Sequence, residues 1–214
     1  MTKNQTTALY HVYDPMCSWC WGYRQVWEQL RAALPDSLTL INVVGGLAPD
    51  TDEPMPADQQ KAIAGYWQQI AEQTGAEFNF DFWQNCQPRR STYPACRAVL
   101  AASKQHAEEA MLYAIQRAYY LRAMNPSDNS TLVTLATELE LDVRQFAIDL
   151  QSERIQTELE QNFTLRRKIG VNAFPSLVLS CGNTLTPIAI DYQDHHGSLN
   201  SINEHLEGYC DSAT

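Results

Sequence analysis

The stretch MCSWCWGY, Met16–Tyr23, places two cysteines and two tryptophans side by side in the chain. Two cysteines separated by two residues fit half of a zinc site, a redox-active dithiol, or a pair of ordinary buried thiols. These three interpretations differ in what they require of the rest of the chain. The segments on either side of the motif therefore decide between them.

The flanking segments predict one βαβ unit. Residues 8–14, ALYHVYD, alternate in polarity and are rich in strand-forming residues, and Asp14-Pro15 ends that strand. From residue 17 to about residue 34 the apolar residues recur at helical spacing. Residues 38–44, LTLINVV, predict a second strand, parallel to the first. The two cysteines then lie at the first strand-to-helix turn.

The middle of the chain is predicted to be helical. Residues 47–56 contain three prolines and indicate a loop that leaves the sheet. Helical periodicity follows as far as residue 169, with a break near His106, a helix capped by Ser130 and a helix over 152–169. Its aromatic and leucine stripes, including Ile63, Tyr66, Trp67 and Ile70, are interpreted as core.

Strand patterns return near the end. Residues 176–180 predict a strand, Gly182-Asn183 a hairpin turn, residues 185–190 the returning strand, and residues 198–209 a final helix. The order is β-α-β, a helical insertion, then β-β-α. We therefore predict an α/β domain from residues 1–49 and 170–214, with an inserted helical domain over residues 50–169.

The position of the motif favours redox chemistry. Cys17 lies at a helix N-terminus, where backbone amides and the helix dipole stabilise a thiolate. Cys20, one turn deeper, is placed to resolve a mixed disulfide formed at an exposed Cys17. A zinc site needs two further ligands, but Cys86, Cys96, Cys181 and Cys210 show no second CxxC spacing. The polar run Asp194-His195-His196 is interpreted as solvated, so no metal is predicted.

The charge and composition of the chain limit the classes of partner and the cellular compartment that we expect. The formal charge of −10 argues against nucleic acid or an anionic membrane surface as a partner. No apolar run has the length of a membrane span, and the first residues do not resemble a secretory signal. We therefore expect a cytoplasmic protein, in which six cysteines indicate catalysis, metal binding or burial rather than structural disulfides.

Two motifs together carry a family resemblance. The first is the strand that ends in Asp14-Pro15 followed by CSWCWG at the helix start, and the second is GVNAFPSLVL at residues 170–179. These motifs resemble those of the DsbA family of thioredoxin-fold oxidoreductases. The likeness covers nearly the whole chain and is nearest to the cytosolic FrnE-like branch of predicted disulfide isomerases. It implies a thioredoxin-like fold and a cis-proline at Pro175 that faces the dithiol.

The same resemblance implies the roles of the site residues. Cys17 and Cys20 are then catalytic, and Ser18, Trp19, Phe174 and Pro175 bind substrate, with the backbone of Phe174 offered to a substrate chain. Trp19 replaces the histidine of DsbA, which implies a less oxidising couple. The implied substrates are protein or small-thiol disulfides, with glutathione as a candidate reductant and no bound cofactor.

Two alternatives stay open. Kappa-class glutathione transferases and 2-hydroxychromene-2-carboxylate isomerases share this architecture but have serine at the position of Cys17, and they activate glutathione instead of exchanging disulfides. Cys86 and Cys96 are candidates for a second redox pair, because the loop between them could bring them together. Cys181 and Cys210 are interpreted as core. The direction of exchange and the oligomeric state are not predicted.

Overall fold

The computed structural model describes the backbone of residues 7–212 and the side chains of residues 7–208. It contains a sheet in the order β2-β1-β3-β4. Strand β1 pairs in parallel with β2 and antiparallel with β3, and β3 pairs antiparallel with β4. The strands are β1 (Thr7–Tyr13), β2 (Thr39–Val44), β3 (Ser176–Cys181) and β4 (Thr184–Ile188).

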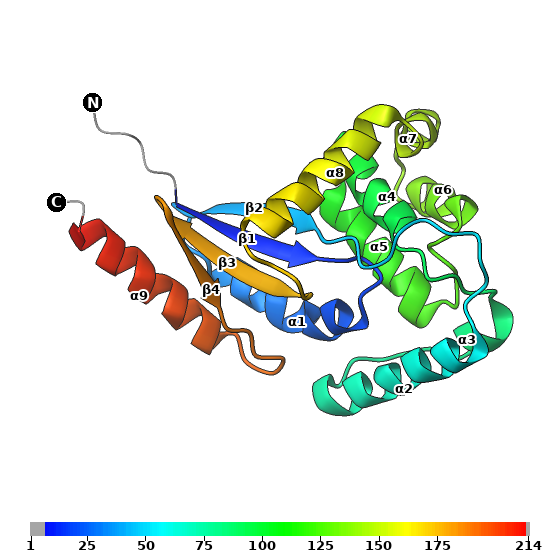
Figure 1. Cartoon of the computed structure of the whole chain (residues 1–214), viewed down its shortest axis with the longest axis horizontal. Helices are drawn as coiled ribbons and strands as arrows, with labels where there is room; N and C mark the ends of the chain where they lie inside the picture. Colours follow the sequence, from blue (N-terminus) through cyan, green and yellow to red (C-terminus); the bar gives the residue numbers. More distant parts are fainter. Residues whose placement is uncertain (1–6, 213–214) are drawn as a thin grey trace.

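Helices cover both faces of the sheet (Figure 1). Helices α1 (Ser18–Ala33) and α9 (His196–Ser212) pack on one face, where Trp27 and Ile202 join buried side chains of β1 and β3. On the other face, Val12, Val43 and Val178 pack against residues at the end of helix α8. Successive side chains of β1 and β3 thus point to opposite faces, and both faces are covered.

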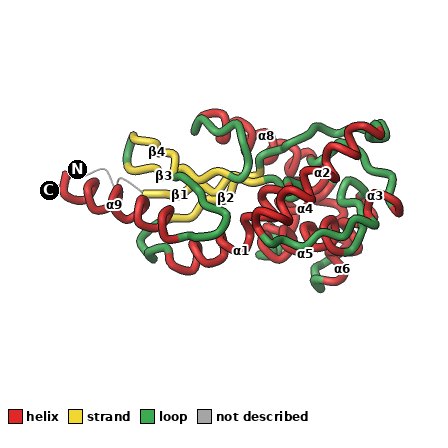
Figure 2. The backbone as a smooth tube through the Cα atoms, turned by 90° about the horizontal axis from the view of Figure 1, so that it is seen from below, coloured by secondary structure: helices red, strands yellow, loops and turns green. Residues whose placement is uncertain are grey.

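Seven helices lie between β2 and β3 in the chain. They are α2 (Ala57–Thr74), α3 (Phe82–Asn85), α4 (Tyr93–Ser103), α5 (Glu108–Leu121), α6 (Asn129–Glu138), α7 (Val143–Leu150) and α8 (Glu153–Lys168). Most of them gather at one end of the sheet, whereas α8 returns along it (Figures 1 and 2). The predicted α/β fold with a helical insertion is therefore confirmed.

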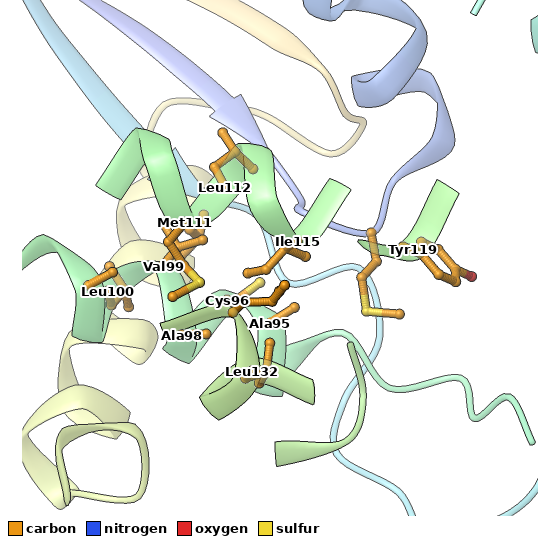
Figure 3. Close-up of a cluster of buried hydrophobic side chains, with 14 of the residues drawn as sticks. Ala95, Cys96, Ala98, Val99, Leu100, Met111, Leu112, Ile115, Tyr119 and Leu132 are labelled. Atoms are coloured by element: carbon orange, nitrogen blue, oxygen red, sulfur yellow. The ribbon is translucent and has the colours of Figure 1, made fainter. Parts of the chain in front are cut away.

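Helix α4 forms the centre of the helical part. It packs against α5, α6, α7 and α8, and its alanines let those neighbours approach closely (Figure 3). The same buried cluster also includes Tyr13, Met16, Cys17 and Cys20 from the sheet side. The dithiol thus lies where the core of the helical part meets the sheet. The division into two domains remains a prediction.

Several predicted boundaries were wrong. Strand β1 ends at Tyr13, because the Asp14 carbonyl accepts a hydrogen bond from the Cys17 N–H in the following turn (3.0 Å). The N-cap of α6 is Asp128 instead of Ser130, which lies inside the helix. Strand β4 ends at Ile188, and α9 begins at His196.

One predicted core residue is on the surface. Tyr66 is 55% exposed, whereas Trp67 and Ile70 on the same helix are fully buried. A stripe at helical spacing includes residues at the edge of a buried face, and periodicity alone does not show where that edge lies. Within the part of the chain that the structure describes, no helix is long and apolar enough to span a membrane.

Candidate active site

Cys17 is the N-cap residue of α1. Its backbone is extended (φ −80°, ψ 118°), so the thiol lies at the N-terminal end of the helix, where N–H groups are free to face it. The side chain is only 7% exposed. The expectation of an exposed sulfur was therefore wrong, and access to Cys17 runs through a cavity.

The two thiols of the motif differ in acidity. A hydrogen bond from the Cys20 side chain is the largest influence on Cys17 and lowers its pKa, with a further contribution from the Cys20 backbone N–H. Burial opposes this lowering. The pKa of Cys20 is raised well above its ordinary value, first by burial and then by its interaction with Cys17. One sulfur is thus favoured as thiolate while the other keeps its proton.

The loop before β3 lies against Cys17. The Cys17 thiol donates a hydrogen bond to the carbonyl oxygen of Phe174 (3.6 Å), and the Phe174–Pro175 peptide bond is cis. The Phe174 ring packs on Gly45 so tightly that a Cβ there would lie 2.3 Å from it. The guanidinium of Arg166 lies 5.4 Å from the ring centroid. These contacts fix the position of Phe174 beside the sulfur.

A cavity of about 330 Å³ opens at Cys17. Its walls come from the CxxC turn, from the loop before β3 and from the helical insertion. Most of the lining residues are apolar or aromatic, and one is cationic. The lining residues are Met16, Cys17, Ser18, Trp19, Leu47, Ile63, Tyr66, Trp67, Arg90, Tyr119, Asn172, Ala173 and Phe174.

Asp14 joins the CxxC turn to the helical insertion. Its fully buried carboxylate accepts hydrogen bonds from the backbone N–H of Met16 (2.9 Å) and Leu47 (2.7 Å) and from the Thr92 hydroxyl (2.7 Å). The Cys96 thiol also donates to it (3.6 Å). Burial raises the pKa of Asp14, and these hydrogen bonds oppose the rise. The sequence identified Asp14 only as a strand end, since its partners are distant in the chain.

The other cysteines have separate environments. Cys86 and Cys96 are both free thiols, and Cys86 donates to the Ala123 carbonyl (3.0 Å) while Cys96 donates to Asp14. Burial raises the pKa of Cys96 strongly. Separate partners for the two thiols give no support to a second redox pair. Cys181 is buried on β3, as expected, and the side chain of Cys210 lies outside the described residues.

The residues predicted from the sequence and its resemblance gather at one place. Ser18, Trp19 and Phe174 line the cavity with Cys17, while Cys20 and Pro175 are buried and do not line it. Sequence reasoning missed the wall that α2, α5 and the loop before α4 supply. The one sequence feature that could have pointed to this wall is the group of aromatic residues near residue 67, which was interpreted from the sequence as core.

The potential metal ligands lie elsewhere. Within the described residues, the three-ligand group found is Asp194 and His195, at the end of the loop before α9, and His196, the first residue of that helix. Cys17 and Cys20 do not belong to it. The zinc interpretation of the CxxC motif therefore finds no third and fourth ligand within the described part of the chain.

The fold agrees with comparisons to known proteins. A thioredoxin family model matches residues 10–186. The chain belongs to the thioredoxin family. A candidate protein disulfide isomerase from Nitrosomonas europaea has a similar structure, with a TM-score of 0.82 and 28% identity over 95% of this chain and 99% of that one.

Two further proteins are similar to this member of the thioredoxin family. The cytosolic disulfide reductase DsbM from Pseudomonas aeruginosa, solved with GSH, has a TM-score of 0.70 and 25% identity over 94% of this chain and 98% of that one. The ClpXP adapter protein SpxH of Bacillus subtilis is 24% identical over 79% of this chain and 56% of its own. The chain thus spans little more than half the length of that curated relative.

Proposed function

We propose that the protein is a thiol–disulfide oxidoreductase of the reductase or isomerase type, with Cys17 as nucleophile and Cys20 as resolving thiol. The observation that carries this proposal is the unequal pair of thiols at the start of α1: a lowered pKa at Cys17, which lines the cavity, and a raised pKa at Cys20 behind it. In such a pair, one sulfur attacks the substrate disulfide, and the other stays a protonated thiol until it resolves the mixed disulfide.

The proposed reaction needs only sulfur chemistry. The Cys17 thiolate attacks one sulfur of a substrate disulfide, forms a mixed disulfide and expels the other sulfur as a thiolate. Cys20 then loses its proton and attacks Cys17, which releases the reduced substrate and leaves a Cys17–Cys20 disulfide. Two molecules of a thiol such as glutathione then reduce that disulfide: the first forms a mixed disulfide with one cysteine, and the second attacks it, which restores both thiols and releases glutathione disulfide. No metal or bound organic cofactor takes part in this proposal.

The site also supplies a surface for the substrate. We propose that Ser18, Trp19 and Phe174 contact it, with Pro175 held behind Phe174. We propose the cytoplasm as the compartment of the protein, which the likeness to a cytosolic disulfide reductase supports.

A paired assay tests the proposed function against glutathione transfer. Wild-type protein should reduce a protein disulfide such as insulin with glutathione as electron source, and Cys17→Ser should fall to the uncatalysed rate because the attacking sulfur is gone. The Cys86→Ser variant, which removes a thiol outside the motif, should keep full activity. A Cys17→Ser variant that conjugates glutathione to an aromatic electrophile as fast as wild type would instead support a transferase.

A further inference from the structure

Apart from the Cys17 sulfur, whose thiolate form is favoured, the cavity at Cys17 contains one charged side chain. Arg90 lines it together with Cys17, and no acidic residue belongs to the lining within the described chain. The remaining walls are mostly apolar and aromatic. A cation in such a wall attracts an anion more strongly than it would on an open surface, because less water screens it.

Arg90 differs sharply from its neighbour Arg89. The Arg89 guanidinium pairs with Asp128 (2.6 Å) and donates to the Ser127 carbonyl (2.7 Å). An isolated β-bridge pairs Arg89 with Pro54, and the chain bends at Arg90. The two arginines line different cavities, and only Arg90 lines the one at Cys17.

Arg90 has no carboxylate partner among the described residues, although acidic residues outnumber basic ones by 25 to 15 in the sequence. Arg24, Arg31, Arg89, Arg97, Arg122 and Lys104 each have one. Other described arginines such as Arg144 also have none, but among the described residues only Arg90 combines this with a place in the lining of the Cys17 cavity. Arg90 is also half-buried. A guanidinium that stays unpaired at the wall of a cavity is available to a carboxylate of a ligand, which it can bind through two parallel hydrogen bonds.

We infer that Arg90 is the carboxylate-binding residue of a subsite for small acidic thiols and disulfides of the glutathione type. The inference rests on the proposed exchange function and adds the substrate class. A volume of about 330 Å³ suits one small molecule. The aromatic walls pack on its apolar atoms, and Arg90 holds its carboxylate while its sulfur meets Cys17.

The exchange step in this subsite balances without a further reactant. The Cys17 thiolate forms a bond to one sulfur of glutathione disulfide, the sulfur–sulfur bond of the ligand breaks, and the other half leaves as glutathione thiolate. In a Cys20→Ser protein that has first been reduced, the reaction stops there. The mixed disulfide at Cys17 can therefore be counted by mass spectrometry.

The test compares an anionic with a neutral disulfide in the reduced Cys20→Ser background. Arg90→Gln should slow adduct formation with glutathione disulfide about 10- to 100-fold, the loss expected for a hydrogen-bonded charge. Adduct formation with bis(2-hydroxyethyl) disulfide should change less than about twofold, since this ligand has no carboxylate. Arg90→Lys should restore part of the rate. Arg144→Gln, which removes an exposed charge on α7 outside the cavity lining, should leave both rates unchanged.

A second measurement does not depend on exchange. S-methylglutathione cannot react with Cys17, and its binding can be followed through the fluorescence of Trp19 and Trp67 in the cavity wall. Arg90→Gln should weaken this binding about 10- to 100-fold. Unchanged binding, or equal slowing with both disulfides, would overturn the role of Arg90. Absence of adducts with either disulfide, with binding still dependent on Arg90, would instead count against the exchange function.

Discussion

Cys20→Ser should convert most of the protein to a mixed disulfide at Cys17 during turnover, whereas wild type should show almost none. The reason is that the two sulfurs have different roles: Cys17 attacks the substrate, and Cys20 releases it. Cys17 keeps its place at the helix N-terminus and still attacks, but the thiol that releases the substrate is missing. The adduct is measured as a mass increase on the intact protein that dithiothreitol reverses.

The controls for this adduct experiment replace Cys17 or Cys86. Cys17→Ser should form no adduct, and Cys86→Ser, which removes a half-buried thiol bonded to the Ala123 carbonyl, should behave as wild type. In a glutathione transferase the ligand supplies the reacting sulfur, so Cys20→Ser would have no trapped intermediate. An adduct located at Cys86 by peptide mapping would show that the nucleophile is misassigned.

Trp67→Ala should lower the free energy of unfolding by about 3–5 kcal/mol, as expected for removal of a buried tryptophan. Trp67 is fully buried and lies within aromatic contact of several rings. Its ring centroid is 4.8 Å from that of Trp83, 5.2 Å from that of Tyr119 and 5.3 Å from that of Phe78. The substitution therefore leaves a cavity in the packing that joins α2 to α5.

Denaturant unfolding measures this loss, and Tyr66→Ala is the matched control. Tyr66 precedes Trp67 on α2 and lines the same cavity, but it is 55% exposed, so its removal should cost less than about 1 kcal/mol. Equal losses for both variants would mean that Trp67 does not anchor the aromatic cluster. A small loss at both positions would mean that α2 contributes little to stability.

The sequence predicted those parts of the fold that local patterns determine. The βαβ unit depends on strand alternation, on Pro15 and on the helical spacing after Cys17, all within short segments. The β-hairpin near the end depends on the turn at Gly182, whose φ of +60° suits glycine. Such features need no knowledge of tertiary packing, and the structure confirms them.

The cavity wall could not be predicted in this way. Tyr66, Arg90 and Tyr119 come from separate segments of the insertion, and their positions relative to Cys17 depend on how the helices pack. The hydrogen bond between Asp14 and Thr92 spans 78 positions in the chain. Periodicity shows which face of a helix is apolar, but it does not show whether a residue at the edge of that face is covered or borders a site.

The reduction potential of the Cys17–Cys20 couple, measured against pH in glutathione buffers, tests the central claim most directly. We expect one reversible two-electron couple whose potential falls by about 59 mV per pH unit where both thiols are protonated, and by about 30 mV above the pKa of Cys17. The change of slope should lie below the pKa of an ordinary cysteine, because the pKa of Cys17 is lowered. Failure of Cys17 and Cys20 to form a reversible disulfide would contradict the proposed function, and a change of slope at or above that value would contradict the assignment of Cys17 as the activated thiol.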